Sequence, residues 1–202
     1  MTGGKLKEVR KTSVEAWGET HVDDAYKEFL ISLVGNPVFQ RFGTECKEDI
    51  LYMLRDVENK MKTVTSEKEN KVTLLLPFSL QEIFEDETGE NLSNAIKQNQ
   101  YADKVSLNRD KLRVDASVMK DIFLKAIQNT VSNVKELMKD SRIQGISSIL
   151  MVGDFSEFKM FQHVIKYNFP NVKVIVPKEA GIVVLKGAVV FGHNPSSVVQ
   201  RV

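Results

Sequence analysis

The sequence predicts a mixed α/β fold, because its apolar residues recur with both the period of a helix and the period of a strand. Apolar side chains lie three and four residues apart between about residues 21 and 34, and again between 116 and 138. The short apolar runs at 72–76 and 149–152 end at Pro or Gly and are typical of strands. The last third of the chain adds the order strand, glycine turn, helix, strand, helix, which also indicates an α/β fold.

The amino-terminal third is expected to contain a strand and two helices. Residues 5–12 alternate in polarity after a tight turn at Gly3-Gly4, which predicts a strand. A helix over about 21–34 is expected to stop at Gly35-Asn36-Pro37, where the residues resist helix continuation. The next helix is expected to carry one buried apolar stripe, formed by Cys46, Ile50, Leu54, Val57, Met61 and Val64.

The middle of the chain alternates strand and helix patterns. Val72–Phe78 is predicted to be a strand that proline ends, and Asp115 is predicted to cap a long helix that runs to Met138. Between them, the pattern predicts short helices over 80–84 and 91–97 and a hairpin of 104–107 with 111–114.

Composition and charge narrow the class of protein. The chain has 202 residues, of which 42% are hydrophobic and 27% charged, and its formal net charge is +1. This balance argues against a binder of nucleic acid or of a membrane surface, since such proteins usually carry a basic excess. The longest apolar stretch, 182–191, is interrupted by Lys186 and is shorter than the roughly 20 residues of a membrane span. Because there is one cysteine, Cys46, and no export signal, we expect a cytoplasmic protein.

Several segments resemble one known family in their order and separation. These segments are Lys5–Val9, Trp17–Asp23, Thr73–Leu80, Ile149–Glu157, Asn171–Gly181 and Leu185–Pro195. They resemble the ATPase domain of the heat shock 70 kDa proteins, in the atypical branch that includes the 12A and 12B types. The chain departs from the common family pattern at Glu19, which replaces one glycine of a paired loop.

The resemblance implies a particular architecture, the second lobe of an actin-like ATPase domain. An inner, ribonuclease-H-like subdomain would comprise residues 1–18 and 116–202, and an outer α+β subdomain would be inserted at 19–115. The resemblance also implies an adenine nucleotide, ATP or ADP, as the ligand. A first lobe that is missing here would cover one face, so we expect that face to expose apolar surface.

One part of the implied adenosine site lies on the second helix. Glu58, Lys62 and Thr65 match the family positions that face the ribose and the adenine. Residues three and four apart share a helix face, so a carboxylate there can accept hydrogen bonds from ribose hydroxyls while a lysine stem covers the base. The alternative interpretation is a charged helix face that only contacts solvent.

The other part lies at the glycine turn. Gly153 and Asp154 match the family's glycine pair at the adenosine, and the aspartate adds a side chain where the ligand would lie. Glu157 replaces an arginine that stacks on adenine in common family members, so we expect weakened affinity. Glu179 is a candidate for the rim of the pocket. Alternatively, Gly153 only ends a strand and Asp154 caps the next helix.

The groups that catalyse phosphoryl transfer in the family are missing. Its two phosphate loops and the lysine of the first lobe have no counterpart here, so the chain looks truncated, and magnesium is expected only together with those loops. We therefore expect no catalytic residues, and weak binding in which ATP and adenosine have similar affinity. His21, His163 and His193 are far apart in sequence and predict no metal site.

Two function classes remain. The first is an adenine-nucleotide-binding lobe of an atypical heat-shock chaperone ATPase that cannot hydrolyse ATP alone, with protein clients or co-chaperones as possible partners. The second is a fragment or pseudo-ATPase that acts as an interaction module without nucleotide. The substitutions at Asp154 and Glu157 favour the second class, whereas Glu58, Lys62 and Thr65 favour the first.

Overall fold

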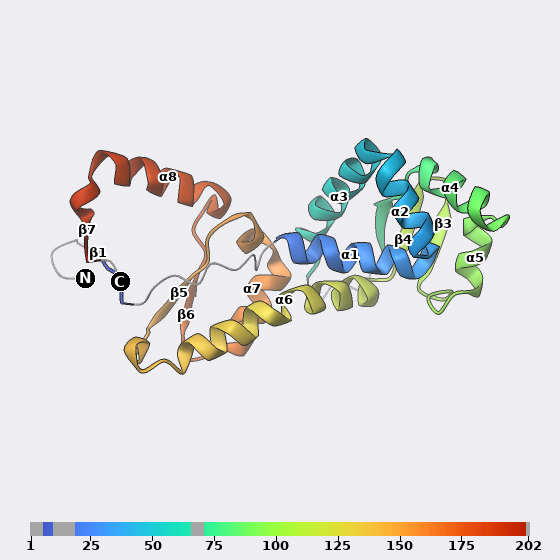
Figure 1. Ribbon diagram of the computed structural model, residues 1–202. Helices are drawn as coiled ribbons and strands as arrows, with labels where there is room; N and C mark the ends of the chain where they lie inside the picture. The colour runs from blue at the N-terminus through green and yellow to red at the C-terminus, as the bar shows by residue number, and fades with distance from the viewer. Residues whose placement is uncertain (1–5, 10–18, 66–70, 201–202) are drawn as a thin grey trace. The chain divides into compact units, whose positions relative to one another are not determined.

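The computed structural model describes residues 6–9, 19–65 and 71–200. Within these ranges helices and short strands alternate, which confirms the predicted mixed α/β class (Figure 1). The turn at Gly3-Gly4 and the loop at Trp17-Gly18 lie outside the described residues. Contacts divide the chain into a central unit, 20–126, and a terminal unit, 1–19 with 127–202. The division predicted from the sequence, 1–18 with 116–202 and an insertion at 19–115, stays a prediction.

The central unit consists of helices and one three-stranded sheet. Its elements are α1 (Glu19–Val34), α2 (Asn36–Glu45), α3 (Lys47–Met61), β2 (Val72–Leu75), α4 (Phe78–Thr88), α5 (Leu92–Gln98), β3 (Val105–Asn108), β4 (Lys111–Val114) and the first half of α6 (Ala116–Met138). The sheet order is β2-β4-β3 and both pairs are antiparallel, so the predicted hairpin is confirmed. In Figure 1, α3 packs against β2 and α5 against β3.

Apolar side chains from every one of these helices fill the core of the central unit. The predicted helical stripe of α1 is buried, with Tyr26 and Leu30 fully inaccessible to solvent. Asp115 caps α6 as predicted, because its Oδ1 accepts a hydrogen bond from the Ser117 amide at 2.8 Å. That hydrogen bond is the main reason why the pKa of Asp115 lies below its ordinary value.

The region between α1 and β2 differs from the prediction in two ways. Gly35, at φ 85°, ends α1 as expected, but α2 begins directly after it with Pro37 in its first turn, a position that favours proline. Cys46 is therefore not on a buried helical stripe; it is the half-buried residue between α2 and α3. The buried positions of α3 are Met53, Val57 and Met61.

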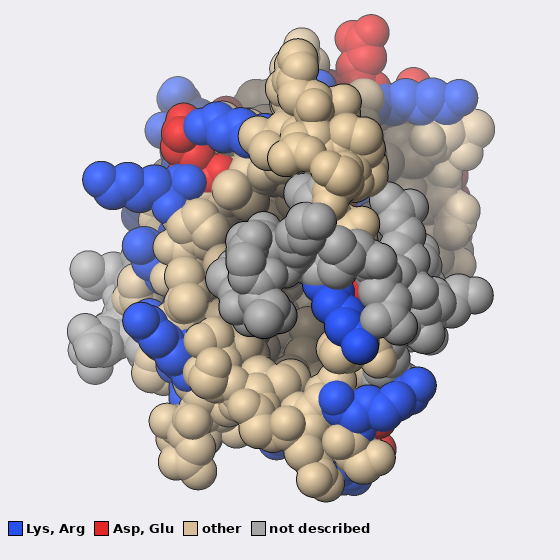
Figure 2. Space-filling view, turned by 90° about the vertical axis from the view of Figure 1, so that its left-hand side faces the viewer, with Lys and Arg blue, Asp and Glu red and all other residues tan. Residues whose placement is uncertain are grey.

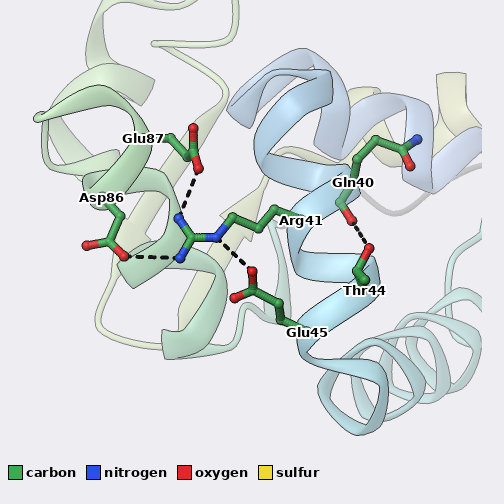
Figure 3. A network of polar contacts seen from close by, with 6 residues as sticks. All are labelled: Gln40, Arg41, Thr44, Glu45, Asp86 and Glu87. Atoms are coloured by element: carbon green, nitrogen blue, oxygen red, sulfur yellow. Dashed lines mark hydrogen bonds and ion pairs between the residues drawn. The ribbon is translucent and has the colours of Figure 1, made fainter.

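An exposed network of charges joins α2 to α4. Arg41 donates hydrogen bonds to Glu45 on its own helix and to Glu87 on α4, both at 2.9 Å, and to Asp86 at 3.4 Å (Figure 3). The hydrogen bonds to Glu45 and Glu87 raise the pKa of Arg41 above its usual value. Because these groups are in contact with solvent, salt should screen most of their attraction.

The terminal unit contains two small parallel sheets. Its elements are β1 (Leu6–Lys7), the second half of α6, a 3₁₀ turn η1 (Ser141–Ile143), β5 (Ser148–Leu150), a 3₁₀ turn η2 (Asp154–Glu157), α7 (Lys159–Asn168), β6 (Lys173–Ile175), α8 (Ala180–His193), a 3₁₀ turn η3 (Pro195–Ser197) and β7 (Val198–Gln200). β1 pairs with β7, and β5 pairs with β6. The predicted order of strand, turn, helix, strand and helix is confirmed.

The terminal unit leaves much apolar surface exposed, including side chains of the apolar run at 149–152, which a buried strand would cover. Leu150 and Val152 are exposed, because β5 pairs only with β6 and no described element covers their side chains. Of the α8 residues, all of which are described, only Ala180 is buried. In the view of Figure 2, much of the described surface that faces the reader is uncharged, with Lys and Arg side chains around it. No helix in the described ranges combines the length and the apolar character that crossing a membrane requires.

Candidate functional site

The carboxyl ends of β5 and β6 bring two predicted site segments together. The strands run parallel, with Leu150 opposite Ile175, and the Met151 amide continues the ladder by donating to the Ile175 carbonyl at 2.9 Å. The glycine turn therefore leaves β5 at the same edge where 176–179 leaves β6. In α/β sheets this edge is where ligands usually bind.

Gly153 occupies a backbone conformation that only glycine adopts easily. Its φ is 89°, and a Cβ added there would meet no atom within 4 Å. The Gly153 amide donates to the Ala180 carbonyl at 2.8 Å, so this turn is tied to the start of α8. Glycine is thus required here by backbone conformation, and the space beside it is open.

Asp154 and Glu157 lie against the first turn of α8. The Glu157 carboxylate accepts a hydrogen bond from the Gly181 amide at 3.3 Å. A Cβ built on Gly181 would lie 2.0 Å from Asp154 Oδ1. Two carboxylates at a helix amino terminus are favourable, because the unpaired amides carry partial positive charge there. Asp154 does not cap the next helix, α7, which begins at Lys159 after Phe158.

Glu179 and Glu157 both line one pocket of the terminal unit. The pocket has a volume of about 350 Å³ and lies between the start of α7 and the turn that follows β6. Its lining residues are Glu157, Lys159, Gln162 and 176–179. Glu179 has a left-handed backbone, φ 57°, and its carboxylate pairs with Lys186 Nζ at 2.5 Å.

Sequence reasoning missed the two lysines of this pocket, Lys159 and Lys178. They follow different strands and are 19 positions apart, so no local motif connects them. The parallel pairing of β5 with β6 is the signal that could have found them, since Lys178 lies three residues after the end of β6 and Lys159 follows β5 after the turn η2.

The remaining predicted residues lie at the end of α3, in the central unit. Glu58 and Lys62 form an ion pair at 2.6 Å, with both side chains partly exposed. The helix ends at Met61, so Lys62 is its capping residue and Thr65 lies beyond it. The prediction that all three residues share one helical face is therefore wrong for Thr65. The end of α3 is hard to predict from the sequence, because no glycine marks it.

Glu58 also contributes to a cluster of acidic groups with α1. Burial raises the pKa of Asp23 above its ordinary value, Lys27 opposes that shift, and the nearby charges of Asp24 and Glu58 add to it. The α3 end is consequently an acidic environment in which Lys62 and Lys27 supply the compensating charge. Carboxylates of this kind can accept hydrogen bonds from hydroxyl groups.

Metal binding has no visible support in the described part of the chain. No three His, Cys, Asp or Glu side chains among the described residues are grouped so that they could hold a metal ion. Because Mg²⁺ is commonly held by one or two carboxylates together with substrate phosphates, the described residues offer no complete magnesium site of their own.

Comparison with known proteins was consistent with the resemblance. The chain is 24% identical over 200 residues to heat shock 70 kDa protein 12B of Homo sapiens. It is 22% identical over 199 residues to heat shock 70 kDa protein 12A of Homo sapiens and of Mus musculus. These alignments cover 98% of this chain but only 29–30% of the relatives' length. No protein-family profile matches the chain, and no solved structure matches it. The chain is thus similar over nearly its whole length to a part of the heat shock 70 kDa proteins of the 12A and 12B types, which confirms the resemblance predicted from its sequence.

Proposed function

We propose that this chain is an adenine-nucleotide-binding part of an atypical heat shock 70 kDa-type ATPase, equivalent to the second lobe of an actin-like ATPase domain. The similarity to the 12A and 12B types over 98% of the chain carries the proposal. In this proposal, 1–18 with 116–202 form the inner subdomain and 19–115 the inserted outer subdomain. The setting would be a cytoplasmic chaperone of the stress response.

The proposal assigns adenosine recognition to two sets of residues. In the terminal unit, Gly153, Asp154, Glu157 and Glu179 would adjoin the nucleoside, and the pocket that Glu157 and Glu179 share supports this role. Its apolar wall, Val176 and Pro177, offers a surface on which a flat base can pack. In the central unit, Glu58, Lys62 and Thr65 would contact the ribose and the adenine.

Hydrolysis is not part of the proposal. Phosphoryl transfer depends on positioned phosphate donors and cations, and magnesium would supply charge neutralisation when bound. The phosphate loops that hold these groups in the resembled family have no counterpart in this sequence. We therefore propose that the chain binds ATP or ADP weakly and does not turn it over.

Titration calorimetry of the purified chain with adenosine tests the proposal. Glu157→Gln and Glu58→Gln should each weaken adenosine binding about tenfold, because a hydrogen bond to a charged group contributes about 1.5–3 kcal/mol. Glu82→Gln is a matched control: Glu82 is an exposed glutamate of α4 and has no proposed role. Equal adenosine affinity in all four proteins, or no adenosine binding at all, would contradict the assignment.

The exposed apolar surface of α8 favours a second candidate function, an interaction module. Val184, Leu185, Val189 and Val190 are all more than half exposed. A first lobe, a protein client or a co-chaperone would bury such residues. Without such a partner, the purified chain should self-associate through them and bind a hydrophobic dye. Leu185→Gln with Val189→Gln should reduce both effects in light scattering and dye fluorescence. Leu51→Gln, at an exposed leucine of the central unit, should not.

A further inference from the structure

The pocket at the ends of β5 and β6 contains charges that the adenosine assignment does not use. Lys159 begins α7 and Lys178 lies in the turn before α8, and both side chains are exposed. Within the described ranges, neither ammonium group has a hydrogen-bond or ion-pair partner. Both nevertheless line the same pocket of about 350 Å³, so a ligand there would meet two cationic groups.

The carboxylates of the pocket already have partners of their own. Glu157 accepts from the Gly181 amide, and Glu179 pairs with Lys186, whose side chain adds a third ammonium group near the rim. Each contact engages one oxygen, Oε1 of Glu157 and Oε2 of Glu179, so each carboxylate already has a partner for its charge, and Lys159 and Lys178 are the lining groups able to bind an anion. The lining contains two ammonium groups and two carboxylates, and since among the described residues only the carboxylates have partners, the two free ammonium groups favour an anion.

We infer that this pocket binds a phosphate group through Lys159 and Lys178. Lysine acts as a mobile point charge that can follow a phosphate oxygen, and the apolar Val176 and Pro177 lie beside the two lysines. A phosphate carried on an adenine nucleotide could therefore contact the lysines while its base packs on the apolar wall. The nucleotide as the source of the phosphate rests on the proposed function; the anion site itself does not.

This inference departs from the expectation that ATP and adenosine bind alike. Two charge-assisted contacts should make ADP bind the chain about tenfold or more tighter than adenosine at low salt. The advantage should shrink as salt is added, because exposed charges are screened.

Calorimetry with adenosine, ADP and inorganic pyrophosphate tests the inference on the whole chain. The variants are Lys159→Gln, Lys178→Gln and the double substitution, with Lys166→Gln, an exposed lysine near the end of α7, as the matched control. The double variant should bind ADP no better than adenosine and should lose pyrophosphate binding, while its adenosine affinity and its circular dichroism stay unchanged. The control should behave as the original chain.

The outcomes separate the two proposals. If the original chain binds adenosine and ADP equally, or if the double variant keeps the preference for ADP, the phosphate site is wrong while nucleoside binding stands. If pyrophosphate binds through the two lysines but adenosine does not bind, the phosphate site stands and the nucleotide function is wrong. If none of the three ligands binds, both proposals are wrong.

Discussion

In the central unit, the helices α1 to α5, the first half of α6 and the β2-β4-β3 sheet surround a core to which each of these helices contributes. In the terminal unit, α8 buries only Ala180 of its 14 described residues. Leu150 and Ile175, on paired strands of the terminal unit, are exposed as well. Apolar burial is the main source of folding free energy, so the central unit should be stable by itself. The terminal unit has apolar surface that a partner would need to cover.

The contrast between a well-buried central unit and an exposed terminal unit also affects the proposed binding residues. The proposed contacts of the terminal unit are at the end of a sheet of only two strands, and those of the central unit are at a helix end backed by a full core. Sites held by a rigid scaffold keep their geometry, whereas sites on marginal elements gain order when a partner binds. Ligand binding in the terminal unit should consequently be more sensitive to whatever covers α8.

The largest expected effect is on the free energy of unfolding, when the same Leu→Ala substitution is made in each of the two units. Leu80 of α4 is fully buried and Leu185 of α8 is 67% exposed. Leu80→Ala should lower the free energy of unfolding by about 2–5 kcal/mol, since it removes buried contacts and leaves a cavity. Leu185→Ala should change it by less than about 0.5 kcal/mol. Urea denaturation measures both, and a cost for Leu185→Ala above about 1 kcal/mol would show that α8 is packed in solution.

A second test uses a buried hydroxyl of the central unit. The Tyr26 side chain is fully buried, and its hydroxyl is the one buried side-chain polar atom without a hydrogen-bond partner among the described residues. Tyr26→Phe should therefore raise the free energy of unfolding by about 1 kcal/mol, because an unsatisfied buried polar group is costly. Tyr167→Phe, at an exposed tyrosine of the terminal unit, is the control and should have no effect.

The same tyrosine gives a pH dependence. Burial, together with the charge of Asp56, raises the pKa of Tyr26 above its ordinary value of 10.0. Above that pH the unfolded chain releases the proton and the folded chain retains it, so stability should fall as the pH rises beyond about 10. The decline should be shallower in Tyr26→Phe and unchanged in Tyr167→Phe. Parallel declines in all three proteins would mean that Tyr26 is not buried.

Local patterns predicted most of the helices and the hairpin, and they failed where distant segments meet. The period of α1 and the cap of α6 at Asp115 are local features, and both were correct. α2 was missed because Gly35-Asn36-Pro37 ends one helix and also starts another. Thr65 was placed on α3 because no glycine marks where that helix stops.

The same difference between local and long-range features applies to the candidate site. The glycine turn was predicted because a glycine directly after an apolar run is a local signal, and the structure adds that Gly153 has a positive φ. The contact of Asp154 and Glu157 with α8 and the convergence of Lys159 with Lys178 were missed, because they depend on the parallel pairing of β5 with β6. Strand pairing between segments 25 residues apart leaves no periodicity in the sequence.

A third test concerns how tightly the glycine turn is held against α8. In Gly181→Ala the new Cβ would lie 2.0 Å from Asp154 Oδ1, so the aspartate must rotate away. Alanine is favoured over glycine in a helix by up to about 1 kcal/mol. We expect Gly181→Ala to be nearly neutral alone and to stabilise by about 1 kcal/mol in an Asp154→Ala background. A double-mutant cycle in urea measures this coupling, and additive effects would show that Asp154 does not lie against α8.

The smallest expected effect is at the surface of the central unit, at the ion pair of Glu58 with Lys62. A solvent-accessible pair four residues apart on a helix contributes about 0.3–0.5 kcal/mol, and this pair is partly exposed, so Glu58→Gln should barely change the free energy of unfolding. It should also lower the pKa of Asp23, because the charge of Glu58 is one of the causes that raise it, and an NMR titration of the Asp23 carboxyl group would detect this. Glu82→Gln, the control on α4, should leave that titration unchanged.

A loss of stability above about 1 kcal/mol in Glu58→Gln would mean that the pair supports the fold, and any accompanying loss of adenosine affinity would then be no evidence for a nucleotide contact. A small stability change together with weaker adenosine binding would instead assign this helix end to ligand recognition, on a scaffold whose own core makes the loss of one surface charge inconsequential.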